Sequence, residues 1–269
     1  MTITSLAQEI TVSASAPTAV ETTEIASSFN AETINQLPTG RTIDDIVALS
    51  PGVTEAGPND QITISGSMSF ESLFLVNGVV VNENVRGQPN PLYIEDAVQE
   101  TTVLTGGVSA EFGRFTGGVV STVTKSGGNE FSGSLRGSLT NDDWTKKSDF
   151  AAQVDPIDVT NSVYEGTLGG RIIRDRLWFF AAARSEERET GAQTFDTALP
   201  YNTTRDDRRI EGKLTGRITD QHTLVGSYID SDLERQNFVT SGRVVDLRSL
   251  SFRDDLRELR SLHYQGLFT

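Results

Sequence analysis

Cysteine is absent from the 269-residue sequence, and histidine is scarce, with only His222 and His263. These shortages exclude a disulfide framework, thiol catalysis and a zinc site made of cysteine and histidine. No run approaches the roughly 18 apolar residues that a membrane-spanning helix needs, so a helical membrane protein is also excluded. A membrane β-barrel remains compatible with the mean hydropathy of -0.28, because polar and apolar residues alternate along its strands.

Basic residues are also in short supply. The chain has 23 Lys and Arg against 37 Asp and Glu, which gives a formal net charge of -14 at pH 7. Such a chain repels phosphate backbones, and we expect no nucleic-acid partner. Four of the basic residues but 14 of the acidic ones fall within residues 1–125. This split suggests that basic groups of the second half pair with acidic groups of the first.

The first nine residues lack the marks of a signal peptide, because they contain neither a basic start nor an apolar run of about 7 to 15 residues. A cytosolic protein would begin in this way. The patterns described below favour a second explanation, in which the natural N-terminus lies elsewhere.

Residues 20–128 are predicted to form a small α+β unit. Asn30 suits a helix N-cap, and a short helix is expected over 30–37. Thr42 and Asp45 have the spacing of a capping box at the start of a second helix. Period-two segments predict strands at 62–64, 73–76, 79–81, 101–104 and 119–123, with a hairpin turn at Asn77 and Gly78.

Residues 129–269 alternate polar and apolar positions, most clearly at 210–218. Each alternating segment has about the 9–11 residues with which a tilted strand crosses a bilayer. The six predicted strands span 130–140, 162–173, 176–186, 208–218, 222–231 and 256–269.

The connections between these strands alternate in length. Residues 174–176 and 219–221 are tight turns, whereas 141–161, 187–207 and 232–255 are long and polar. Outer-membrane barrels have this asymmetry. The aromatic run 178–180 fits an interfacial girdle with one ring turned inward, although the core of a soluble β-sandwich is an alternative place for it.

Five motifs carry a family resemblance. The most specific is EFGRFTGGVVSTVTKSG at 111–127, and LGGRIIRDRLWFF at 168–180 is a second. Shorter ones are LPTGR at 37–41, IVALSPGV at 46–53 and VNG at 76–78. Together they resemble TonB-dependent outer-membrane receptors, with the greatest similarity to the Oar-like branch.

The resemblance implies active transport across the outer membrane of a Gram-negative-type bacterium. In this family a plug fills a 22-stranded barrel in outer-membrane lipid, an extracellular ligand binds from outside, and the inner-membrane protein TonB pulls on a short box. The box is β-prone and suits addition to a partner's sheet edge; a disordered tail is the alternative. The segment that looks like this box, and where TonB contact is expected, comprises Glu9, Ile10, Thr11, Val12, Ser13 and Ala14.

Six strands cannot close a barrel of that size, because open edges would present unpaired backbone groups to lipid. We therefore expect a fragment that lacks its signal region and most of the barrel. It is expected to comprise a tail at 1–19, an α+β plug with a small mixed sheet and short helices at 20–128, and the first antiparallel transmembrane strands of an incomplete barrel at 129–269.

Four basic residues are candidates for ion pairs between plug and barrel: Arg114, Arg136, Lys213 and Arg217. The sequence departs from the family at Ser65, where many plugs carry arginine, and this puts an ion pair at that position in doubt. The family's common aspartate before glycine is replaced by asparagine at position 77. The ligand is not identified by the sequence, and plug loops near 67–72 and 84–92 are expected to help bind it.

A secreted or surface-displayed β-rich adhesion protein is the alternative function, and it predicts aromatics facing a shared core. An enzyme is not expected, because Ser109 lacks the final glycine of a nucleophile elbow and no phosphate-binding glycine motif occurs. No cofactor or metal is expected either. The paired aspartates at 142–143, 206–207 and 254–255 could hold calcium, but solvated charge explains them more simply.

Overall fold

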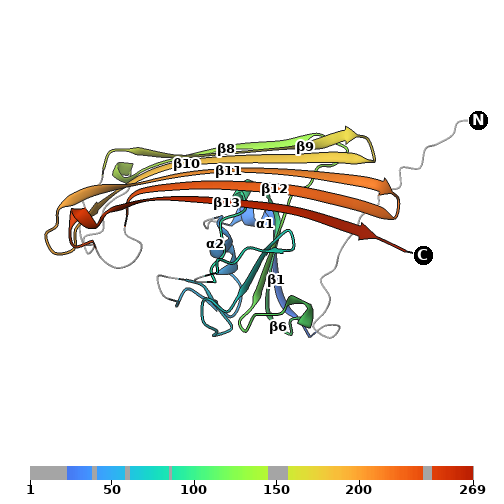
Figure 1. The fold of residues 1–269 in the computed structure, drawn as a ribbon, viewed down its shortest axis with the longest axis horizontal. Helices are drawn as coiled ribbons and strands as arrows, with labels where there is room; N and C mark the ends of the chain where they lie inside the picture. The colour runs from blue at the N-terminus through green and yellow to red at the C-terminus, as the bar shows by residue number, and fades with distance from the viewer. Residues whose placement is uncertain are drawn as a thin grey trace, which may run out of the picture.

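The computed structural model describes residues 23–37, 41–57, 61–84, 87–144, 157–238 and 244–268. In this part of the chain, an N-terminal unit with a small mixed sheet lies against one face of a long antiparallel sheet (Figure 1). The segment 9–14, where TonB contact is expected, lies outside the described residues.

Seven short strands belong to the N-terminal unit: β1 (Ile25–Asn30), β2 (Val53–Thr54), β3 (Thr63–Ile64), β4 (Leu73–Val76), β5 (Val79–Val80), β6 (Val98–Gly106) and β7 (Val119–Thr124). Five form one sheet in the order β1-β6-β7-β4-β5, while β2 and β3 pair separately. β4 and β7 are parallel and the remaining pairs antiparallel, which confirms the predicted mixed sheet. Asn77 and Gly78 have φ values of 49° and 78°, as the hairpin turn between β4 and β5 requires.

Two short helices, α1 (Ala31–Gln36) and α2 (Ile43–Val47), begin where the sequence predicts them. Asn30 Oδ1 accepts a hydrogen bond from Thr33 N at 2.8 Å, and Thr42 and Asp45 form the predicted capping box. The apolar faces of both helices are buried against the mixed sheet. The described residues contain no helix long and apolar enough to cross a membrane. Four 3-10 turns complete the elements: η1 (Glu95–Ala97), η2 (Ala110–Phe112), η3 (Asp142–Trp144) and η4 (Leu247–Ser249).

The long sheet contains six strands in chain order, each antiparallel to the next. They are β8 (Ser132–Asn141), β9 (Thr160–Ile173), β10 (Leu177–Gln193), β11 (Pro200–Thr219), β12 (His222–Phe238) and β13 (Ser251–Gly266). The number of strands and their antiparallel arrangement agree with the prediction.

The strand lengths differ from the prediction, since β11 alone has 20 residues. Pairing of β10 with β11 continues to Gln193 and Pro200, and β12 pairs with β13 as far as Phe238 and Ser251. Much of the predicted loops 187–207 and 232–255 is therefore strand. The prediction followed apolar alternation, which ends where charged side chains take over and pair across neighbouring strands.

The two faces of the long sheet differ in burial. Leu135 and Leu256 face away from the N-terminal unit and are 90% and 73% exposed. On the opposite face, Ile229 is fully buried in the core of the N-terminal unit, and Phe180 packs on the segment around η1. Phe180 is thus the inward ring of the aromatic run. The apolar outer face has no second protein layer in the described part of the chain, so a sandwich with a shared core does not fit (Figure 1).

Candidate functional site

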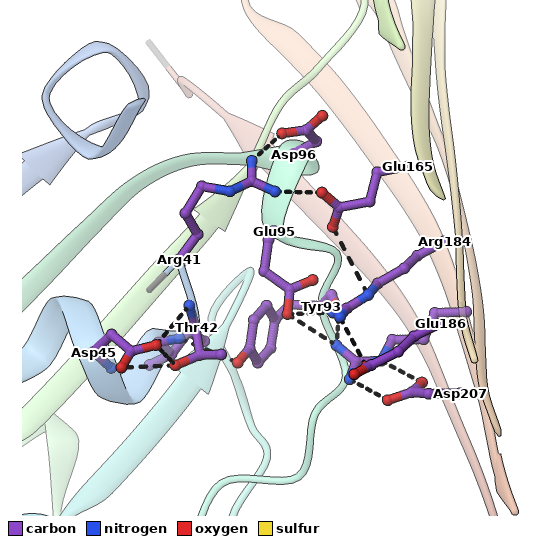
Figure 2. Close-up of polar contacts among 12 residues, drawn as sticks. Arg41, Thr42, Asp45, Tyr93, Glu95, Asp96, Glu165, Arg184, Glu186 and Asp207 are labelled. Atoms are coloured by element: carbon purple, nitrogen blue, oxygen red, sulfur yellow. Dashed lines mark hydrogen bonds and ion pairs between the residues drawn. The ribbon is translucent and has the colours of Figure 1, made fainter. Parts of the chain in front are cut away.

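Charged side chains dominate the contact between the N-terminal unit and the long sheet (Figure 2). Two neighbouring carboxylates of η1, Glu95 and Asp96, lie at its centre, and each side chain is only 5% exposed. η1 follows the fully buried Ile94 and leads into β6, which fixes its position at both ends. The two carboxylates reach different arginines.

Arg41 binds one carboxylate from each part of the molecule. Its guanidinium forms ion pairs with Asp96 of η1 and with Glu165 of β9. The capping box of Thr42 and Asp45 starts at the next residue and holds the backbone there. Burial opposes the charged form, but Glu165 and the hydrogen bond to Asp96 outweigh it and raise the pKa of Arg41. Arg41 is therefore a permanent cationic bridge between the N-terminal unit and the long sheet.

Asp96 gathers two further cations. Arg136 of β8 places Nε 3.0 Å from Asp96 Oδ1, and Lys125 Nζ donates to the Asp96 backbone oxygen at 2.7 Å. Burial lowers the pKa of Lys125; Asp96 opposes that shift, and Arg136 and Arg41 add to it. The Asp96 carboxylate thus connects Arg41 with β8, and its backbone oxygen binds Lys125 at the end of the N-terminal unit.

Glu95 faces the neighbouring strands. It accepts a hydrogen bond from Arg184 of β10, and Arg209 Nη1 of β11 lies 3.6 Å from its Oε1. Arg209 is held by two hydrogen bonds of 2.8 and 2.6 Å to Asp207, and it donates to the backbone oxygen of Tyr93 at 2.9 Å. The bidentate pair orients the guanidinium toward the N-terminal unit.

Tyr93 links this network to α2. Its buried hydroxyl accepts a hydrogen bond from Ile43 N at 3.1 Å, which satisfies one of the free amides at the start of the helix. Burial and then the charge of Glu95 raise the pKa of Tyr93, although Arg209 opposes the shift. The phenol is consequently neutral under physiological conditions.

A second polar contact lies at the ends of β4 and β7. Lys213 Nζ of β11 donates to Thr124 O at 2.8 Å, to Thr124 Oγ1 at 2.6 Å and to Asn77 Oδ1 at 3.2 Å. Glu211, two residues earlier on the same strand face, accepts from the Thr124 hydroxyl. Asn77 Oδ1 also accepts from Thr124 N at 3.0 Å, so the amide provides an acceptor where an aspartate is common in the family.

Two of the four candidate residues predicted from the sequence lie in the contacts between the N-terminal unit and the long sheet, and two do not. Arg136 and Lys213 lie in the two contacts just described. Arg217 lies beyond the N-terminal unit, near the turn after β11, and its carboxylate partner is Asp220 at 3.7 Å. The expected pairing of Arg217 with the first half is thus corrected to a turn contact. Arg114 follows η2 with a φ of 59°, and within the described residues no carboxylate lies at ion-pair distance from it.

The residues at the centre of the network were not among the candidates predicted from the sequence. Arg41 carried a signal, because it ends the LPTGR motif, but that motif does not show which carboxylate it binds. Ser65, at the position where an ion pair was in doubt, donates to Thr105 O at 2.7 Å within the N-terminal unit. The other missed residues are Glu95, Asp96, Glu165, Arg184 and Arg209.

Comparisons with known proteins agree with this architecture. Residues 18–120 match the family model of the TonB-dependent receptor plug domain, and residues 123–246 match that of an outer membrane beta barrel domain. The TonB-dependent transporter Oar of Myxococcus xanthus is 38% identical over 149 residues, which cover 52% of this chain and 14% of Oar.

Solved receptor structures share the fold. The siderophore receptor PirA from Acinetobacter baumannii has a TM-score of 0.68 at 21% identity, over 90% of this chain and 37% of PirA. The ferric enterobactin receptor PfeA from Pseudomonas aeruginosa, as the Q482A mutant with enterobactin, has a TM-score of 0.68 at 20% identity, over 91% of this chain and 39% of PfeA. The chain therefore spans well under half the length of these proteins.

The structure is that of an outer-membrane protein with a plug packed on the lumenal side of β-barrel strands. The chain belongs to the TonB-dependent receptors, in the Oar-like branch, and its location is the Gram-negative outer membrane. The relatives named above are receptors and transporters rather than enzymes. Below, the N-terminal unit is called the plug, β8–β13 are called the barrel strands, and the sheet that they form is called the wall.

Proposed function

We propose that this chain supplies the plug and the first barrel strands of a receptor that actively imports a ligand across the outer membrane. The single observation that carries the proposal is the charged contact between plug and wall, in which Arg41, Glu95 and Asp96 meet side chains of four barrel strands. Ion pairs and hydrogen bonds can be exchanged for water as the plug moves, whereas an apolar contact of that size would oppose separation more strongly. The contact is therefore suited to reversible release.

Energy is proposed to arrive from TonB through residues 9–14. The first described residue, Thr23, lies two positions before β1. β1 occupies one edge of the plug sheet and pairs along its length with β6. Tension on the preceding segment would act first on this edge strand. The proposed partners are TonB, outer-membrane lipid around the exposed apolar face, and an extracellular ligand.

An Ile10→Pro substitution in the complete receptor tests the coupling. Proline cannot donate a backbone hydrogen bond, so it blocks addition of the segment to a partner's sheet edge. We expect loss of energised uptake with ligand binding at the cell surface unchanged, and Ile10→Val should behave like the wild type. Uptake by the proline variant at the wild-type rate would contradict TonB coupling at this segment.

The transported compound can be sought with a deletion strain of the receptor. Growth on iron chelates, cobalamin, glycans and peptides should fail for one class and be restored by the complete gene. A strain that grows equally on every class would argue against an import role.

A further inference from the structure

Four arginines form a row across the lumenal face of the barrel strands. Arg188, Arg205, Arg235 and Arg253 occupy directly opposed positions on β10, β11, β12 and β13. Opposed residues of antiparallel strands have Cβ atoms about 4.5–5.5 Å apart, and like charges at that spacing repel. Such a row needs compensating negative charge.

The neighbouring rows of the same face supply only part of this negative charge. One row contains Glu186, Asp207 and Asp255, in register with Leu233. Asp207 binds Arg205 at 2.9 Å as well as Arg209, and Asp255 lies at 2.7, 3.2 and 3.6 Å from Arg253, Arg235 and Arg257. Asp207 and Asp255, two of the aspartates considered for calcium, are thus held by guanidinium groups. The arginines of the three rows are Arg184, Arg188, Arg205, Arg209, Arg235, Arg253 and Arg257, and they outnumber the three carboxylates of the same rows.

Several of these arginines also have one nitrogen atom without an acceptor. Among the described residues, Arg184 Nε, Arg205 Nε, Arg235 Nε and Arg257 Nη1 are buried without a hydrogen-bond partner. Buried donors of this kind are uncommon and costly, and each needs an explanation. Within the described part of the chain, Glu95 Oε2 and Ser231 Oγ are also buried without a partner, so donors and acceptors are incompletely paired at the place where the arginines gather.

A cavity lies beside the row, between the wall and the plug. It measures about 440 Å³, within the usual range of ligand pockets, and Arg188, Arg205 and Arg235 line one side. Gln88 and Asn90 of the plug line it as well. Both belong to the loop near 84–92 that the sequence analysis associated with ligand binding. Asp44, Glu83 and Glu95 of the plug also border the cavity, so the charge excess is concentrated on the strand side.

We propose that this cavity binds a ligand carrying several oxyanion groups, carboxylate or phosphate, through Arg188, Arg205 and Arg235, which line it. The inference rests on the proposed function, because it names the class of compound that the receptor takes up. The planar guanidinium fork matches carboxylate and phosphate oxygens, and the row repels free cations. The long-connection end of the strands, where the cavity lies, is the extracellular side in outer-membrane barrels.

Calorimetric titration of the purified complete receptor in detergent tests the proposal. The probes are citrate, inositol hexakisphosphate and the neutral maltoheptaose. We expect at least one polyanion to bind with an affinity that falls as salt is added, and maltoheptaose not to bind. Binding of citrate alone assigns carboxylates, and binding of inositol hexakisphosphate alone assigns phosphates. Failure of both polyanions, or equal binding of maltoheptaose, would overturn the proposal.

Two variants identify the row as the binding surface. Arg205→Gln combined with Arg235→Gln should weaken polyanion binding about tenfold or more, while Asp207 keeps Arg209 and Asp255 keeps Arg253. Arg188→Gln should weaken binding as well. Because the Arg188 side chain is exposed, this substitution should not disturb folding. Arg217→Gln removes the same charge near the opposite end of β11 and is the matched control.

Wild-type affinity in both row variants, or an equal loss in Arg217→Gln, would contradict binding at the row. These titrations contain no TonB. Polyanion binding at the row can therefore be found even if the Ile10→Pro variant shows no dependence of uptake on TonB. Conversely, TonB-coupled uptake can be found even if neither polyanion binds, so the two proposals fail separately.

Discussion

Arg41 and Glu165 form an ion pair between the plug and the barrel wall although 124 positions separate them in the sequence. The Glu165 side chain is 1% exposed and that of Arg41 is 20% exposed, so water screens the pair only weakly. Arg184 approaches the same carboxylate, with Nε 3.8 Å from Oε1. Glu165 thus lies between Arg41 of the plug and Arg184 of the neighbouring barrel strand.

Replacement of Glu165 by Gln should loosen the plug. The change removes the negative charge between Arg41 and Arg184 while keeping the shape of the side chain, and we expect a loss of about 1–3 kcal/mol in plug stability. Faster proteolysis of the plug in outer-membrane preparations would report the effect. Glu187→Gln, at an exposed position on β10, is the control and should leave the digestion rate unchanged.

Lys213→Met should release the ends of β4 and β7. The substitution removes three donated hydrogen bonds to Thr124 and Asn77 and leaves Glu211 without its neighbouring cation. Hydrogen exchange at the Thr124 amide should rise by about tenfold or more, corresponding to at least about 1.4 kcal/mol. Leu214→Met, one residue along and on the outer face, should not change this exchange. Unchanged protection in Lys213→Met would show that the contact does not hold these strand ends.

Gly127→Ala should impair the junction between plug and barrel. A Cβ at this position would lie 2.1 Å from the backbone oxygen of Phe179 and 2.8 Å from that of Gly170, and neither backbone group can move aside easily. The expected destabilisation is about 1–3 kcal/mol, visible as a lower thermal unfolding temperature or lower yield of folded receptor. Gly128→Ala is the adjacent control, because nothing lies within 4 Å of its added Cβ. Equal stability of the two variants would contradict the close packing of Gly127.

Tyr93→Phe should destabilise the plug by about 1–3 kcal/mol, because the buried Ile43 amide loses its acceptor. The effect should depend on pH. Since the pKa of Tyr93 is raised in the folded protein, its favourable contribution is complete below the ordinary tyrosine pKa of about 10 and declines above it. The stability difference between wild type and variant should therefore narrow as the pH rises past about 10. Tyr164→Phe, on the exposed outer face, should show no such difference at any pH.

Local patterns in the sequence were sufficient for most of the elements. The capping box at Thr42, the Asn77 turn and the alternation at 210–218 each depend on interactions between near neighbours, and all three appear in the structure. β1 was not predicted, because IASSFN has no clear alternation and becomes a strand by pairing with β6. The outer halves of β10–β13 were missed for a related reason, since charged side chains there are compatible with strand only when a neighbouring strand neutralises them.

The sequence by itself determined the two capped helices, the hairpin turn and the position of six barrel strands, and the resemblance it carries led to the family. Only the tertiary structure decided that Arg41 meets Glu165, that Glu95 and Asp96 reach different strands, and that four arginines align beside a cavity. The physical reason is register. A tight turn fixes the register of only the two strands that it joins. Charges distant in the chain become neighbours only after all the strands have paired and the plug has packed against them.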